Sequence, residues 1–285
     1  QGLFVAILTT HSEIASLFAL PVGSLIAEKV SWPSVFYIHA LICAFFSILW
    51  LLVYRNDSIN HPMITVEEME MIKRGKSHVI TVESSPPYRA IFTSKAVWAV
   101  LVSAIGTIFV GHFMGVFSPQ YFTSVLGYSP TLTGTLNIIP TICLLPVKAV
   151  TGILSDKMTC LSETAKLRLF NSLACFLGAL FFLLVILVPP STSVPAGTAL
   201  IMIPFILLAF TTGGFHKAAV MISRQHSSFV FSIMHIFAMV ALLLGSFIIP
   251  LLTPDNTFII ILVVSNTIFI IFAKAEPEEW AEQKV

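Results

Sequence analysis

Eight long apolar runs dominate this sequence and restrict what the chain can fold into. They cover residues 3–27, 34–53, 96–117, 132–154, 169–188, 197–215, 228–252 and 256–273. A helix needs about 20 mostly apolar residues to cross the hydrocarbon core of a membrane. The runs are continuous, and they are too long for the roughly 10-residue alternating strands of a membrane barrel. The sequence therefore predicts an all-α membrane protein with eight spanning helices.

The composition supports this prediction and excludes several other classes. Of the 285 residues, 56% are hydrophobic and 10% are charged, whereas roughly 25% are charged in an ordinary soluble domain. Disordered chains have the opposite balance, and a net charge of +1 gives no reason to expect a nucleic-acid partner. The four cysteines lie in or beside apolar runs, so no disulfide scaffold is expected. The expected partner of the surface is the lipid bilayer.

The basic residues predict how the chain is oriented in the membrane. Except for Lys29 and Lys148, every Lys and Arg lies in the C-terminal tail or in the loops after the second, fourth and sixth runs. The positive-inside rule places these segments in the cytoplasm. Because the number of spans is even, both visible ends of the chain are expected there as well. The membrane itself is expected to be the plasma membrane or that of an intracellular vesicle.

Residues 55–95 form the one long polar stretch. Within it, Thr65-Val-Glu-Glu68 has the spacing of a capping box and predicts a short helix through Lys73, which Gly75 would end. A linker between two membrane bundles is the simplest interpretation, and a solvated loop that only connects is the alternative. The expected parts are the last helices of one bundle (1–54), the linker (55–95), a second bundle (96–273) and a tail (274–285).

Polar residues inside the apolar runs are few, and their distribution predicts a cavity. The second, fifth and eighth runs contain no charged residue, and only the second contains a histidine, His39. We predict that these three helices face lipid and that the other helices surround a polar cavity. The ionisable or amide residues of those other helices are His11, Glu13, His112, Asn137, Lys148, His216 and His235.

Glu13 is the only acidic residue deep in a run. It lies ten residues into the first span, which is about 15 Å by helical rise. A carboxylate at that depth has to be protonated, paired or bound to a cation. One interpretation is a residue that binds the coupling ion or gates the substrate. The alternative is that the span enters the membrane later and that Glu13 lies near the headgroups.

The remaining polar residues are candidates for binding a substrate or a coupling ion, each with a structural alternative. His112 and His235 would relay protons or donate into a cavity, or they are core histidines bonded to a neighbouring helix. His216 would form an anion-attracting vestibule with Lys217 and Arg224 at the cytoplasmic mouth after the sixth run, or these residues only reflect the positive-inside bias. Asn137 would bind substrate or join two helices. Lys148 is expected to extend its ammonium group to the membrane surface, with anion binding as the alternative.

No enzyme site is predicted. The sequence contains no P-loop, no HExxH and no paired-cysteine motif, and no spacing implies a nucleophile with its base. No cofactor is expected, although a co-transported sodium ion or proton would fit a transporter. A receptor conflicts with the even number of spans. A truncated or degenerate product without transport activity stays open as an alternative.

Several short motifs resemble those of a known transporter family. Gly152-Ile-Leu-Ser-Asp156-Lys157 resembles the cytoplasmic loop motif of the major facilitator superfamily, in which the glycine permits close helix contact and the aspartate braces a gate. The resemblance thus implies a gating role for Gly152, Asp156 and Lys157. Motifs similar to those of the anion:cation symporter branch follow in the correct order, namely Pro21-Val-Gly23-Ser-Leu, Trp32-Pro-Ser-Val-Phe-Tyr37, His61-Pro-Met-Ile-Thr-Val-Glu-Glu68, Phe92-Thr-Ser-Lys-Ala-Val-Trp98 and Gly213-Gly-Phe215.

That branch contains type I sodium–phosphate cotransporters, vesicular glutamate transporters and sialin. The resemblance implies a major facilitator fold of which helices five to twelve are visible, and the start at Gln1 fits this expectation. It also implies a monomeric secondary transporter of phosphate or an organic anion, coupled to sodium or protons and working by alternating access. Glutamate is not the expected substrate, because Thr107 stands where glutamate carriers have an arginine in helix seven, and Gly214-Phe-His216-Lys departs from the Gly-Phe-Asn of many members.

Overall fold

The chain is helical throughout the part that the structure describes. The computed structural model describes residues 2–55, 65–73, 86–188, 193–248 and 254–281, and every regular element in these ranges is a helix. Among these residues, five stretches are helices long and apolar enough to cross a membrane, and two shorter apolar helices cover 95–111 and 257–272. The all-α prediction is confirmed. Gly75 and the first part of the polar stretch lie outside the described residues.

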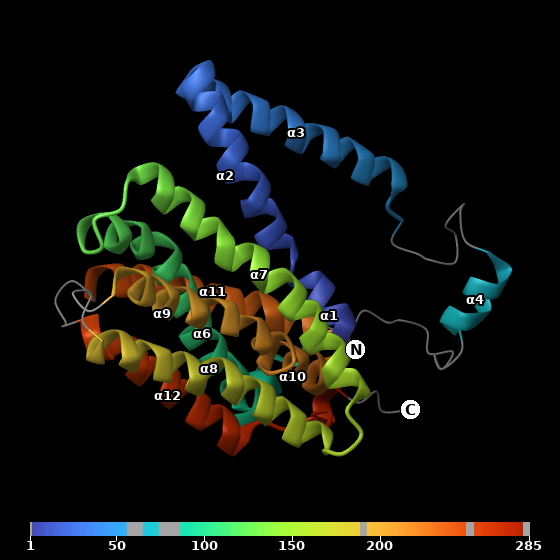
Figure 1. Cartoon of the computed structure of the whole chain (residues 1–285). Coiled ribbons are helices and arrows are strands. Elements are labelled where there is room, and N and C mark those ends of the chain that lie inside the picture. The colour runs from blue at the N-terminus through green and yellow to red at the C-terminus, as the bar shows by residue number, and fades with distance from the viewer. Residues whose placement is uncertain (1, 56–64, 74–85, 189–192, 249–253, 282–285) are drawn as a thin grey trace. The chain divides into compact units, whose positions relative to one another are not determined.

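The chain divides into two compact units, of which the larger comprises Gln1–Leu17 and Pro86–Val285. Its long helices lie side by side in Figure 1. The helices of this unit are α1 (Gly2–Leu8), the start of α2 (His11–Lys29), α5 (Tyr88–Thr93), α6 (Lys95–Ser124), α7 (Pro130–Lys157), α8 (Glu163–Leu187), α9 (Val194–Leu207), α10 (Phe215–Ser223), α11 (Ser227–Ile248) and α12 (Pro254–Phe272). It also has the 3₁₀ turns η1 (Leu208–Thr212), η2 (Arg224–His226) and η4 (Glu279–Ala281).

Serine side chains begin four of these helices. The hydroxyl of Ser94 accepts a hydrogen bond from the amide of Val97 at the start of α6. Ser129, Ser162 and Ser193 do the same for α7, α8 and α9. A hydroxyl at this position satisfies one of the amide groups that the first turn of a helix leaves without a partner. Polar residues at the ends of the apolar runs therefore set where these helices start.

The core of the larger unit lies where α6 meets α8, α10, α11 and α12. α12 packs against both α8 and α6, and α11 packs against α6. Leu101, Phe215, Met234 and Phe269 are fully buried there. The segment after α12 returns to α8, where the backbone amide of Ala275 donates to Thr164 Oγ1 at 3.1 Å. Apolar contacts thus fix how the helices pack, and polar links fasten their ends.

A buried amide network crosses this core. Asn171 on α8 donates from Nδ2 to Asn266 Oδ1 at 2.8 Å and to Ser103 Oγ at 3.0 Å. Its Oδ1 accepts from the backbone amide of Phe215 at 3.3 Å. A side chain at position 214 would not fit, because its Cβ would lie 2.8 Å from Asn171 Oδ1. Gly214 therefore allows α10 to begin directly against α8.

The first predicted span is two helices and not one. α1 ends at Leu8 and α2 begins at His11, with a turn at Thr9 and Thr10. Both threonine hydroxyls donate back to carbonyls of α1, Thr9 to Val5 at 2.9 Å and Thr10 to Ala6 at 2.6 Å. Such back-bonding competes with the helical ladder and bends helices. The same kind of departure occurs in the sixth run, where η1 separates α9 from α10.

The smaller unit is Phe18–Ser85 and contains the rest of α2, α3 (Trp32–Val53) and α4 (Val66–Lys73). The predicted capping-box helix through Lys73 is confirmed by α4. α3 has no buried residue among those described. The fifth and eighth spans, α8 and α12, do bury residues, among them Asn171 and Asn266. That these three spans face lipid stays a prediction. The domain boundaries expected from the sequence stay a prediction.

Replacing Asn171 by Ala is expected to lower the free energy of unfolding by about 1–3 kcal/mol, because Asn266 and Ser103 lose a buried hydrogen-bond partner. Thermal unfolding of the purified protein in detergent measures the change. Leu169→Ala on the same helix serves as the control, since the Leu169 side chain is exposed. Equal destabilisation by both substitutions would contradict the role given to the network.

Candidate functional site

An ion pair joins α2 to α7 inside the apolar part of the larger unit. Lys148 Nζ lies 2.7 Å from Glu13 Oε1, and the two side chains are 7% and 18% exposed. The structure contradicts the prediction that Lys148 extends to the membrane surface, because its ammonium group is buried against Glu13. For Glu13, the expectation that a deep carboxylate has to be protonated, paired or cation-bound is met by pairing.

The break between α1 and α2 supplies a further partner for Lys148. The carbonyl oxygen of Thr9 accepts a hydrogen bond from Lys148 Nζ at 2.8 Å. The neighbouring carbonyl of Leu8 accepts one from Nδ1 of His11 at 2.7 Å. Carbonyl groups at a helix end need hydrogen-bond donors from outside the helix. The helix break and the buried lysine are therefore parts of one arrangement.

Two further predicted histidines lie on α10 and α11. His216 stacks on Phe215 with ring centroids 4.0 Å apart, and its Nδ1 donates to the carbonyl of Thr211 at 3.2 Å. His216 interacts electrostatically with Lys148 and with His235. His235 is exposed, and its Nδ1 donates to the carbonyl of Phe231 at 2.9 Å. The structure thus pairs Glu13 directly with Lys148, and it gives the two histidines hydrogen bonds within their own segments.

The predicted gating motif lies at the end of α7, directly against α1. A Cβ at position 152 would lie 2.9 Å from the carbonyl oxygen of Gly2 and 3.0 Å from Ala6 Cβ, so only glycine fits this contact. Asp156 accepts hydrogen bonds from the backbone amides of Gly2 at 2.8 Å and Leu3 at 3.0 Å. Lys157 is exposed. The gating role of these residues stays a prediction, but the geometry has the close helix contact that it requires.

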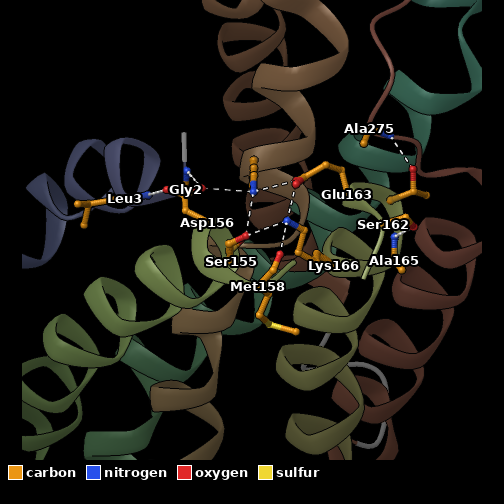
Figure 2. A network of polar contacts seen from close by, with 12 residues as sticks. Gly2, Leu3, Ser155, Asp156, Met158, Ser162, Glu163, Ala165, Lys166 and Ala275 are labelled. Atoms are coloured by element: carbon orange, nitrogen blue, oxygen red, sulfur yellow. Dashed lines mark hydrogen bonds and ion pairs between the residues drawn. The ribbon is translucent and has the colours of Figure 1, made fainter. Parts of the chain in front are cut away.

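A cluster of charges surrounds the same end of α7, and we call Ser155, Asp156, Glu163, Lys166 and Lys217 the charged cluster. Figure 2 shows Asp156 between Gly2 and the other members of the charged cluster. Lys217 Nζ lies 3.0 Å from Ser155 Oγ, 3.2 Å from Glu163 Oε2 and 3.5 Å from Asp156 Oδ1. Lys166 pairs with Glu163 and donates to the carbonyls of Met158 at 3.0 Å and Ser155 at 3.2 Å.

Sequence reasoning missed the structural role of these two lysines. Both are buried, each with a side chain 3% exposed. The sequence interpretation attributed Lys217 to orientation in the membrane, and it assigned Lys166 only to a basic loop. A usable signal was the presence of Asp156 and Glu163 within the same basic segment, because buried ammonium groups need acidic partners.

Asn137 lies on α7, about three helical turns before Lys148, and His112 lies on α6. Asn137 Oδ1 accepts from Ser118 Oγ at 2.6 Å, and its Nδ2 donates to the carbonyl of Thr133 at 2.9 Å. These contacts join α7 to α6, which is the structural alternative named for Asn137. His112 is part of α6, but its side chain lies outside the described residues.

The arrangement places two opposite charges side by side in a buried position. A buried ammonium group beside a carboxylate is a pair of opposite charges that a small ion can enter and separate. Among the described residues, no group of three His, Cys, Asp or Glu side chains is placed to hold a metal ion. The chemistry of the region is therefore charge compensation in a low-dielectric setting.

Comparison with known proteins fits this chemistry. The sequence model of the Major Facilitator Superfamily matches residues 1–223. The chain belongs to the Major Facilitator Superfamily. Its fold is accordingly the major facilitator fold, and it is a multi-pass membrane protein of a family of transporters.

The most similar curated relatives include carriers of two kinds of anion. Vesicular glutamate transporter 3 of Danio rerio is 25% identical over 95% of this chain and 48% of its own length. Sodium-dependent phosphate transport protein 1 of Homo sapiens is 25% identical over 100% of this chain and 63% of its own length. Sodium-dependent phosphate transport protein 4 of Homo sapiens is 25% identical over 93% and 66%. The chain thus spans about half to two thirds of these relatives, and the resemblance to the anion:cation symporter branch is confirmed.

Replacing Gly152 by Ala is expected to destabilise the protein by about 1–3 kcal/mol, because the added methyl group would overpack the contact of α7 with α1. Thermal unfolding in detergent measures the effect. Gly134→Ala on the same helix is the matched control, since a Cβ there meets no atom within 4 Å. A destabilisation by Gly134→Ala as large as that by Gly152→Ala would contradict the close-contact interpretation.

Proposed function

We propose that this protein is a secondary active transporter that moves a small anion across a membrane. The anion is inorganic phosphate or an organic anion, and its movement is coupled to sodium ions or protons. The cycle is alternating access, in which two helical bundles expose a central site first to one side and then to the other. The complete protein acts as a monomer in the plasma membrane or in a vesicle membrane, with the visible ends of the chain in the cytoplasm.

The observation that supports this proposal most directly is the buried Lys148 beside Glu13. An ammonium group inside an apolar region costs free energy unless a partner compensates its charge, and such residues often mark functional sites. Lys148 offers a positive charge to an anion, and Glu13 offers a negative charge to a cation. A transporter that couples an anion to a cation needs both kinds of group.

The names of the relatives limit the choice of transported anion but do not identify it. The curated relatives are named for glutamate and for phosphate. At the position where glutamate carriers have an arginine, this chain has Thr107, whose hydroxyl donates to the Ser103 carbonyl of its own helix at 2.8 Å. A threonine there provides no positive charge for a second carboxylate, so phosphate or an organic monoanion is the better candidate.

The direct test is uptake of radiolabelled phosphate and of monocarboxylates by cells that express the complete reading frame containing this chain. Imposed sodium and proton gradients identify the coupling ion. Lys148→Ala is expected to reduce uptake by roughly tenfold to a hundredfold, because a hydrogen bond to a charged group contributes about 1.5–3 kcal/mol.

Surface expression has to be measured beside uptake, since removing one member of a buried pair also destabilises the protein. Lys148→Arg keeps the charge and is expected to retain part of the activity. Lys95→Ala removes an exposed lysine and serves as the control. Uptake by the Lys148→Ala protein equal to that of the unmodified protein, at equal surface expression, would contradict the proposal that Lys148 binds the anion.

A further inference from the structure

Two buried threonine hydroxyls on α7, those of Thr133 and Thr151, have no hydrogen-bond partner within the part of the chain that the structure describes. Thr151, which is 1% exposed, is the one that lies close to Lys148 along the helix. Helical threonines usually donate to a carbonyl of the preceding turn, as Thr107, Thr198 and Thr267 do in this protein. A buried polar group without a partner costs free energy, which points to a ligand that supplies the missing bond.

Thr151 lies one helical turn from Lys148. Residues three apart share a face of a helix, so Lys148 and Thr151 lie on the same side of α7. Ser155 continues this face at the next turn, where it contacts Lys217. The bonds of Lys148 Nζ to Thr9 and Glu13 use two of the three donors of an ammonium group. An ammonium group and a hydroxyl on one buried face are suited to an oxyanion.

The Glu13 carboxylate contacts the ammonium group of Lys148. Its Oε1 lies 2.7 Å from Lys148 Nζ, and its Oε2 accepts a hydrogen bond from Ser12 Oγ at 3.2 Å. The pair has no net charge. An entering monoanion would give this region a charge of −1, which an apolar interior disfavours strongly. The charge returns to zero only if one cation arrives with the anion.

We infer that Lys148 and Thr151 form the subsite for the charged group of the transported anion, and that the anion displaces Glu13, which then binds one proton. This inference rests on the proposed transport function and names its coupling ion. In the step, the anion replaces the Glu13 carboxylate on Lys148, and a hydronium ion transfers a proton to a Glu13 carboxylate oxygen, so that one O–H bond breaks in hydronium and one forms on Glu13. On the other side the anion leaves, the Glu13 O–H bond breaks as the proton returns to water, and the carboxylate pairs with Lys148 again.

Other charged or titratable groups belong to the same electrostatic setting. His216 on α10 interacts electrostatically with Lys148 and with His235 on α11, and His11 lies two residues before Glu13. Further along α7 and α10 are Asp156, Lys157 and Lys217. The Asp156 carboxylate and the Lys217 ammonium group are already engaged with each other and with Glu163 or the start of α1. Glu13 is therefore the acidic group that contacts Lys148.

The subsite is tested with Thr151→Val in the complete protein. The substitution removes only a hydroxyl that makes no bond among the described residues, so thermal stability is expected to stay unchanged. The KM for phosphate or for a transported monocarboxylate is expected to rise about tenfold, as for the loss of one bond to a charged ligand. Thr133→Val is the matched control, because Thr133 is also a buried α7 threonine without a bond at its hydroxyl. An unchanged KM for Thr151→Val, or an equal rise for both variants, overturns the subsite.

The proton step is tested with Glu13→Gln in proteoliposomes. The unmodified protein is expected to accumulate the anion when the outside is more acidic than the inside, and uptake of a monoanion should not respond to the membrane potential. Glu13→Gln is expected to lose this accumulation while retaining exchange of labelled for unlabelled anion, since exchange needs no net proton movement. Glu67→Gln on α4 removes an exposed acidic group and is expected to behave as the unmodified protein.

The outcomes separate the two proposals. If the unmodified protein moves no anion under any gradient, the proposed function itself fails. If transport occurs but depends on sodium and not on pH, or if Glu13→Gln still accumulates anion from a proton gradient, the transport function stands and the exchange of partners at Lys148 is overturned.

Discussion

Charge in an apolar interior is the constraint that organises this structure. Two regions bury lysine side chains, and in both the ammonium group is compensated by an acidic group from another helix. Lys148 pairs with Glu13, and Lys217 pairs with Glu163 and Asp156. These pairs add polar links to the apolar packing, since Lys148 joins α7 to α2 at one level and Lys217 joins α10 to α7 and α8 at another.

The helix breaks follow from the same constraint. A regular helix satisfies its own carbonyl groups and offers nothing to a neighbouring side chain. The turn at Thr9 and Thr10 releases carbonyl oxygens, one of which accepts from Lys148. In the sixth run, the glycines after η1 let α10 begin against Asn171. Irregular backbone is placed where polar groups converge, which is where a membrane protein tolerates it.

The sequence was informative about elements and less so about partners. Runs of apolar residues predicted the helices, because one helix crossing a bilayer has a fixed length. The pairing of Glu13 with Lys148 was not predictable, since these residues are 135 positions apart and only the packing of α1 and α2 on α7 brings them together. Asn171 and Asn266 were not predicted as a buried pair, because their runs contain no charged residue and were expected to face lipid. The glycine of the family motif, by contrast, did predict a close contact, which Gly152 makes with α1.

The contact at Gly152 has a mechanical consequence. Where Gly2 faces Gly152, the backbones of α1 and α7 approach each other directly. Two electrostatic attachments hold the same segments together, one at Asp156 and one at Lys148. Any movement of α1 along α7 would have to break or stretch these attachments, so a change in either charge would alter how firmly the two helices are held.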